Sequence, residues 1–319
     1  MSESEIVPSQ TATTSNERLL AALAHGSVIL SFFGALSPAL LWSFQRRKSP
    51  YVAFHALQAA GYQMFMFWVG MAAYLVFFII IFLLVIVFAS VSAEPGSAVS
   101  TQMMLGLQAS MYALLFGFIG IYFLLGIVGA VLCLMDKDFK YPILGRRLEQ
   151  YLGRGPQPND PLDEAKEEQW MSAMGHASAI LFIWGLFTPL ALFLIAQKDS
   201  PRLRFQSAQA AVYQTLATVV YFGVSFCYVG AFFGFFLSLL SNPDFGSSLS
   251  PTQGIGFLVF MLVFLIIGIF VMLALPTYHL FAMIAGIRVL RGHDYRYPIL
   301  GRLLAKRFPM EKPASDSEK

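Results

Sequence analysis

Two very long stretches of the chain contain no lysine or arginine. One runs from Lys48 to Lys137 and the other from Arg204 to Arg288. A helix needs only about 20 apolar residues to cross a hydrocarbon core about 30 Å thick. Each stretch therefore predicts a hairpin of transmembrane helices. The composition agrees, because 12% of the residues are charged and 57% are hydrophobic, whereas about 25% are charged in a soluble domain.

The sequence repeats itself in tandem. Residues 18–63 match residues 169–214 at 16 of 46 positions, with a constant offset of 151. A second match pairs residues 138–146 with residues 294–302 at an offset of 156. Two matches in the same order indicate a duplication. The expected organisation is a polar tail (1–17), a first membrane repeat (18–151), a polar linker (152–168), a second membrane repeat (169–308) and a polar tail (309–319).

Each repeat contains three apolar tracts that are expected to be helical, because lipid offers no partner for backbone polar groups. The first tract of each repeat is interrupted by a glycine and a proline, which weaken a helix. These expected helix breaks are Gly34 and Pro38 in the first repeat and Gly185 and Pro189 in the second. The predicted fold is an all-α polytopic membrane protein, in which each repeat has a broken or re-entrant first tract and a long transmembrane hairpin, with four to six crossings in total.

The distribution of the 21 basic residues favours the re-entrant alternative. If every tract crossed, the two repeats would be inverted and the basic residues would divide nine to twelve across the membrane. If the first tract of each repeat returns to its own side, all 21 lie on one face. This arrangement satisfies the positive-inside rule. We therefore expect an integral membrane protein with both termini in the cytoplasm.

Polar and aromatic residues recur at matched positions near the start of each hairpin. Residues four apart share one face of a helix, and ionisable groups within apolar tracts are candidates for function. The candidate seam consists of His25, Phe54, Gln58, Tyr62 and Gln63, matched by His176, Phe205, Gln209, Tyr213 and Gln214. The seam either fixes the packing of the first tract, with each histidine bridging to polar groups such as Gln58 or Gln209, or lines a groove for a substrate or lipid.

Catalysis is not indicated by any residue pattern. No Asp or Glu lies within an apolar tract, and no nucleophile, phosphate loop or metal-ligand spacing is evident. Cys133 and Cys227 are interpreted as small buried hydrophobes. The sequence therefore predicts no enzyme activity, no cofactor and no bound metal. The small net charge of +3 argues against a nucleic-acid partner.

Basic residues follow the last apolar tract of each repeat. Such residues next to a membrane attract anionic headgroups, with about 1 kcal/mol per charge. The candidate lipid contacts are Lys140, Arg146 and Arg147 in the first repeat and Arg296 and Arg302 in the second. The alternative is that they only set the topology.

The motif residues resemble a known family. His25, Pro38, Ser49-Pro50, Phe54-His55, Gln58 and Tyr141-Pro142 resemble the bacterial domain-of-unknown-function 4870 proteins, and the second repeat has Gln206 in place of His55. That family is regarded as related to the chloroplast import component Tic-twenty. The resemblance implies a membrane helical fold in the bacterial inner (plasma) membrane and, through the import component, a role near protein translocation.

Three functions follow as hypotheses. The first is a non-enzymatic accessory, assembly or translocation-related factor. The second is a small channel or carrier with a cleft between the repeats, which would expose His25 and Gln58 to water. The third is a structural subunit of a larger membrane protein complex.

Overall fold

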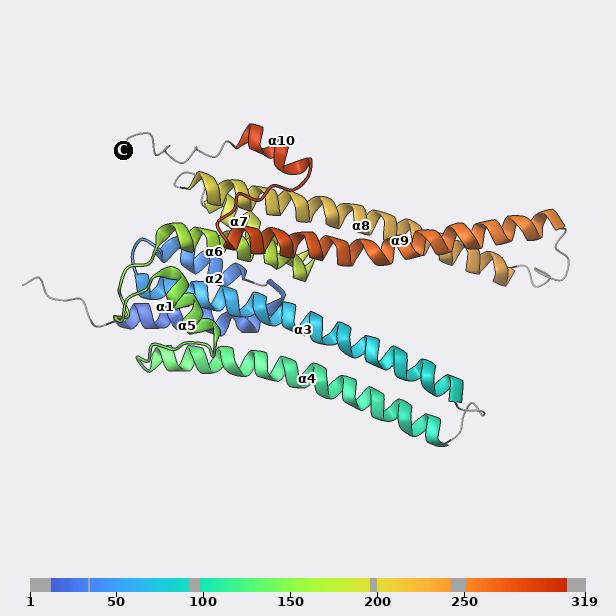
Figure 1. Ribbon diagram of the computed structural model, residues 1–319, viewed down its shortest axis with the longest axis horizontal. Coiled ribbons are helices and arrows are strands. Elements are labelled where there is room, and N and C mark those ends of the chain that lie inside the picture. The colour runs from blue at the N-terminus through green and yellow to red at the C-terminus, as the bar shows by residue number, and fades with distance from the viewer. Residues whose placement is uncertain (1–12, 34, 92–97, 196–199, 242–250, 309–319) are drawn as a thin grey trace, which may run out of the picture.

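A computed structural model describes residues 13–33, 35–91, 98–195, 200–241 and 251–308, and within these ranges the chain is helical without strands (Figure 1). The first repeat contains α1 (Ser15–Gly26), the 3-10 helix η1 (Ser27–Phe33), α2 (Leu36–Gln45), α3 (Pro50–Val91), α4 (Ala98–Leu134) and α5 (Leu144–Leu152). The second contains α6 (Glu164–Ala177), the 3-10 helices η2 (Ser178–Leu181) and η3 (Trp184–Leu186), α7 (Phe187–Ile195), α8 (Pro201–Ser241), α9 (Pro251–Leu290) and α10 (Leu300–Arg307). Most of the expected tails, 1–12 and 309–319, lies outside the described residues.

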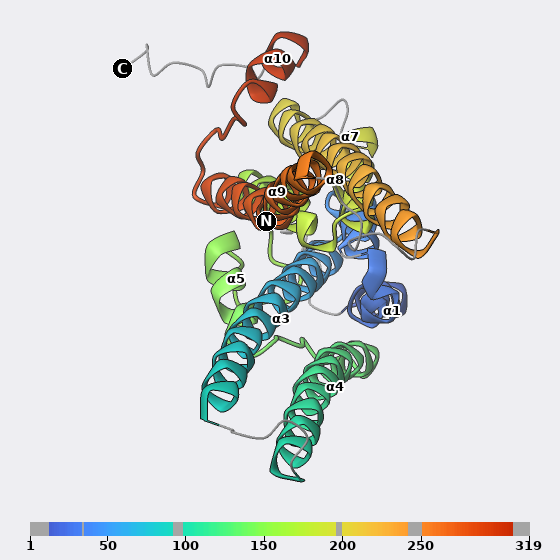
Figure 2. The same ribbon diagram turned by 90° about the vertical axis from the view of Figure 1, so that its right-hand side faces the viewer.

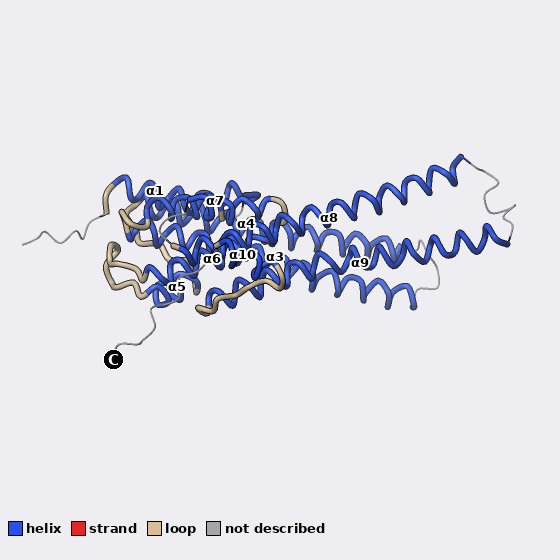
Figure 3. The backbone as a smooth tube through the Cα atoms, turned by 90° about the horizontal axis from the view of Figure 1, so that it is seen from above, coloured by secondary structure: helices blue, strands red, loops and turns tan. Residues whose placement is uncertain are grey.

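Within the described residues, four helices are long and apolar enough to cross a membrane: α3, α4, α8 and α9. They contain 42, 37, 41 and 40 residues. At 1.5 Å per residue, each is roughly 55–63 Å long, about twice the thickness of the hydrocarbon core. The hairpins α3–α4 and α8–α9 point the same way from a body of short helices (Figures 1 and 3). Viewed end-on, they occupy opposite halves of the molecule (Figure 2). The predicted polytopic helical fold is confirmed.

The first tract of the first repeat is broken into α1, η1 and α2. Helix α1 begins with a capping box, in which the side chains of Thr14 and Glu17 satisfy each other's backbone N–H groups. The chain leaves helical geometry at Leu30 and returns along α2, which packs on α1 and α3. With 12 and 10 residues, neither α1 nor α2 can span the membrane alone.

Of the expected helix breaks, Gly185 lies in the broken stretch between α6 and α7, whereas both prolines lie in the first turn of the helix that follows the break. Pro38 and Pro189 are the third residues of α2 and α7, and a proline is tolerated there because the first N–H groups of a helix have no intrahelical partner. Helices α1 and α6 end upstream, at Gly26 and Ala177, with Ser27 and Ser178 as their C-caps. Gly185 lies in η3, where a Cβ atom would overlap the Ser178 carbonyl. Gly34 lies outside the described residues.

The body of the protein encloses the first third of α3. Residues 51–64 are all buried, whereas large apolar side chains face outward from Phe65 onward. Trp170 of α6 donates from Nε1 to the Leu57 carbonyl (2.9 Å), and Trp42 of α2 donates from Nε1 to Glu167 (2.6 Å). These buried bonds tie the two repeats together and leave the rest of each hairpin for lipid.

Candidate functional site

The polar seam of the first repeat fastens the segment after α4 to the buried part of α3. Gln58 donates from Nε2 to the Phe139 carbonyl (3.0 Å) and accepts at Oε1 from the backbone N–H of Tyr141 (2.7 Å). The Tyr62 hydroxyl donates to the Tyr122 carbonyl (3.1 Å), and its ring stacks on that of Tyr141 with centroids 3.9 Å apart. The glutamine thus pairs the Phe139 carbonyl and the Tyr141 N–H of the backbone segment after α4.

The second repeat reproduces this arrangement. Gln209 donates to the Tyr295 carbonyl (3.1 Å) and accepts from the backbone N–H of Tyr297 (2.9 Å). Tyr213 donates to the Tyr278 carbonyl (3.1 Å) and stacks on Tyr297 at 4.0 Å. The same four side-chain roles at matched positions indicate that the duplication preserved a packing device.

The second glutamine of each repeat holds the bend of the first tract. Gln63 donates to the Ser27 hydroxyl (2.8 Å), and Gln214 donates to the Gly175 carbonyl (2.9 Å). Both glutamines are fully buried. Each therefore pairs a polar group at the point where α1 or α6 ends.

The two phenylalanines of the seam are fully buried beneath arginine side chains. The Arg154 guanidinium lies 4.0 Å from the ring centroid of Phe54, and that of Arg296 lies 5.9 Å from Phe205. A cation over an aromatic face is attracted to it, so these rings help to anchor the basic loops on α3 and α8.

His25 is fully buried and contacts polar groups other than Gln58. Its Nδ1 lies 3.0 Å from the Tyr141 hydroxyl, and its Nε2 lies 2.9 Å from Nδ1 of His55. Burial, followed by the neighbouring His55, holds the pKa of His25 well below its usual value. His25 is therefore neutral and can donate only one hydrogen bond.

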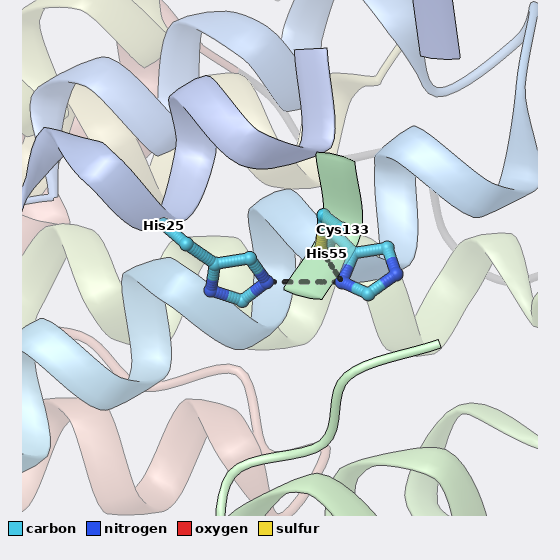
Figure 4. Close-up of side chains that lie close together, drawn as sticks. All are labelled: His25, His55 and Cys133. Atoms are coloured by element: carbon cyan, nitrogen blue, oxygen red, sulfur yellow. Dashed lines mark hydrogen bonds between the residues drawn. The ribbon is translucent and has the colours of Figure 1, made fainter. Parts of the chain in front are cut away.

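His55 lies between His25 and the thiol of Cys133 (Figure 4), and its far side faces the carboxylate of Asp138. The Cys133 sulfur lies 3.7 Å from Nδ1 of His55. On the other side of the ring, Nε2 lies 3.3 Å from Asp138, without the alignment of a good hydrogen bond. Burial alone would raise the pKa of Asp138, but His55 and Arg154 hold it well below its usual range. Asp138 is therefore ionised, and both terminal nitrogens of Arg154 donate hydrogen bonds to its carboxylate (3.1 Å each).

The corresponding place in the second repeat has different chemistry. His176 lies 3.2 Å from the Tyr297 hydroxyl through Nδ1, as in the first repeat, but its Nε2 lies 3.1 Å from Oε1 of Gln206. The position matching Cys133 is Val289, at the offset of 156. Burial lowers the pKa of His176 to about 4. This neutral histidine is satisfied by an amide and a phenol alone.

Sequence analysis did not select His55, Cys133 or Asp138 as site residues. They lie on α3, on α4 and in the loop after α4, so no spacing motif joins them. The available signal was the comparison of the two repeats, because His55 and Cys133 change to Gln206 and Val289 while the surrounding seam is kept.

The candidate lipid contacts differ in whether their charged groups are exposed or paired with a carboxylate. Arg146, Arg147, Arg296 and Arg302 are exposed. Lys140 instead pairs with Glu149 (2.6 Å) and lies 3.6 Å from Asp138. The exposed arginines therefore fit the lipid hypothesis better than Lys140 does.

The fold and the seam define the class: an integral membrane protein built from two tandem copies of a bent first tract and a transmembrane hairpin. The model of the magnetosome magnetite crystal formation protein family (MamF/MmsF) matches residues 16–148 and again residues 167–304. The chain belongs to this family, with two tandem copies of the family region. No curated protein and no solved structure matches it.

This match overturns the assignment by resemblance. The motif residues suggested the domain-of-unknown-function 4870 family and the import component Tic-twenty, whereas both repeats match the MamF/MmsF model. The expected link to protein translocation rested on that assignment and is therefore no longer supported.

Proposed function

We propose that this protein is a non-enzymatic factor of the magnetosome membrane that acts in magnetite crystal formation. The carrying observation is the family match over both repeats. The geometry supports a non-enzymatic role, because the matched polar residues are used to bond the bent tracts to the hairpins.

The proposed orientation places both termini and the body of short helices at the cytoplasmic face. All 21 basic residues then lie on that face. The far ends of the two hairpins face the compartment in which the crystal forms. The exposed arginines of this face, Arg146, Arg147, Arg296 and Arg302, are proposed to contact anionic headgroups.

A channel or carrier that uses the seam is less well supported. His25 and Gln58 have no exposed surface, and their polar atoms bond to neighbouring helices and loops. A water-filled pathway through them would require these bonds to open.

Complementation tests the proposal. A magnetite-forming bacterium that lacks its own family member would express this chain with a fluorescent tag, and crystal sizes would be measured by electron microscopy. The expected result is a tagged chain in the magnetosome membrane and crystals shifted towards wild-type size. A chain that reaches this membrane without changing the crystals, or that never reaches it, would contradict the proposal. A stoichiometric partner found after mild-detergent purification would instead support the role of a structural subunit.

A further inference from the structure

Three potential metal ligands converge in the first repeat. One nitrogen of His25, one nitrogen of His55 and the sulfur of Cys133 all lie within 4.8 Å of one another. The three side chains are fully buried. They come from α1, α3 and α4, so the cluster forms only when the bent first tract packs on its hairpin (Figure 4).

The spacing of these atoms suits a small divalent ion. With metal–nitrogen distances of about 2.0–2.1 Å and a metal–sulfur distance of about 2.3 Å, tetrahedral ligand atoms lie roughly 3.3–3.6 Å apart. The nitrogen–nitrogen separation between His25 and His55 is 2.9 Å, and the nitrogen–sulfur separation between His55 and Cys133 is 3.7 Å. These two separations would change by a few tenths of an ångström on binding. The third pair, the His25 nitrogen and the Cys133 sulfur, lies within 4.8 Å, so these two atoms would approach each other by up to about 1.2 Å to reach tetrahedral spacing.

The surroundings supply the outer partners that metal-binding histidines use. Such histidines commonly direct their second ring nitrogen to a carboxylate or another oxygen, which sets the tautomer. Here Nε2 of His55 faces Asp138 (3.3 Å), and Nδ1 of His25 faces the Tyr141 hydroxyl (3.0 Å). The two remaining nitrogens point towards each other and towards Cys133 (Figure 4).

We propose that His25, His55 and Cys133 bind one divalent transition-metal ion, with Zn²⁺ as its representative. On binding, the Cys133 thiol loses its proton to solvent. His25 binds the ion through Nε2 as the tautomer with its proton on Nδ1, where it donates to the Tyr141 oxygen. Two neutral imidazoles and a thiolate leave the ion with one positive charge, which the ionised Asp138 faces across His55.

The bound ion would fasten the bent first tract to its hairpin. The second repeat needs no ion for this purpose, because His176 bonds directly to Gln206 and Val289 replaces the thiol. The expected stoichiometry is therefore one ion per chain. This inference stands independently of the proposed role in crystal formation.

The second repeat supplies substitutions that its own fold already accepts. The full-length chain would be purified in detergent through a tag without histidines, from cells grown with added Zn²⁺, and zinc per chain would be measured by mass spectrometry. We expect about one zinc ion in the wild type and in the control His176→Ala. The double variant His55→Gln, Cys133→Val is expected to retain less than a tenth of the zinc content of the wild type. Circular dichroism would verify that each variant is helical.

Equal zinc content in the wild type and the folded double variant would overturn the proposal. Exchange with Co²⁺ gives a second readout, because a thiolate ligand produces a charge-transfer band in the near ultraviolet. Absence of this band from the wild type would also overturn it. The reciprocal variant Gln206→His, Val289→Cys is expected to raise the content from one zinc ion to two, and a folded variant that stays at one would count against the three side chains as a sufficient ligand set.

Discussion

A single methyl group at Gly61 is expected to disrupt the junction between the repeats. Gly61 lies on the buried part of α3, against the indole of Trp170 on α6. A Cβ atom there would overlap one edge carbon of the ring and lie 3.1 and 3.4 Å from two others. The indole is also fixed by its 2.9 Å bond to the Leu57 carbonyl, so it cannot move without weakening that bond.

The magnitude follows from three effects. Overpacking a core costs about 1–3 kcal/mol, and loss of the indole hydrogen bond costs about 1 kcal/mol more. Replacing glycine by alanine within a helix returns up to about 1 kcal/mol. The net expectation for Gly61→Ala is a destabilisation of roughly 1–3 kcal/mol.

Thermal unfolding in detergent, followed by circular dichroism, measures this effect. The matched control is Gly117→Ala on α4, where an added Cβ would meet nothing within 4 Å. We expect Gly61→Ala to lower the Tm by several degrees relative to Gly117→Ala. Equal Tm values for the two variants would refute the packing described for Trp170.

Further predictions concern titration, hydrogen bonding and metal removal. Burial raises the pKa of Glu167 to about 7, from an ordinary value of 4.5. The contribution of the protonated Glu167 to stability is therefore complete below about pH 4.5 and lost as the pH rises through about 7. If the free energy of unfolding is measured across this range, Glu167→Gln should become increasingly more stable than the wild type as the pH rises. Tyr141→Phe and Tyr297→Phe each remove the hydroxyl partner of a buried histidine, so each is expected to cost about 1 kcal/mol; no loss of Tm in either would contradict these bonds. A strong chelator is expected to lower the Tm of the wild type but not that of His55→Gln, Cys133→Val, and equal responses would argue against the metal site.

Much of the fold could be predicted because lipid imposes strict rules on sequence. The stretches from Lys48 to Lys137 and from Arg204 to Arg288 are each long enough for two membrane crossings, which indicates a hairpin in each repeat. The sequence predicted a break in each first tract, and Gly185 lies within the break of the second repeat, but the two prolines do not make the bend. Pro38 and Pro189 mark the first turn of the returning helix, where proline costs little, and the bend itself depends on tertiary bonds from Gln63 and Gln214.

The cluster around His55 could not be predicted from spacing. His25 and Cys133 reach it only because α1 folds back beside α4, and Asp138 reaches it from a loop. Cys133 alone resembles a small core residue, and it is indeed buried, whereas Cys227 is exposed.

The family assigned by resemblance was wrong for a physical reason. Gln58 bonds α3 to the loop after α4, and Tyr62 bonds α3 to α4, so these motif residues serve the packing of the bent tract and the hairpin. Such residues indicate the fold and carry little information on the biological process.

The orientation of the repeats is central to the proposed function, and thiol labelling tests it most directly. Single cysteines at Arg47→Cys and Arg202→Cys, in a chain without Cys133 and Cys227, would be treated with a membrane-impermeant maleimide in sealed vesicles of each orientation. Helices α3 and α8 begin at the same end of the molecule (Figure 1), so both sites are expected to react only from the cytoplasmic side. Labelling of the two sites from opposite sides would show that the first tract crosses the membrane and would contradict the proposed topology.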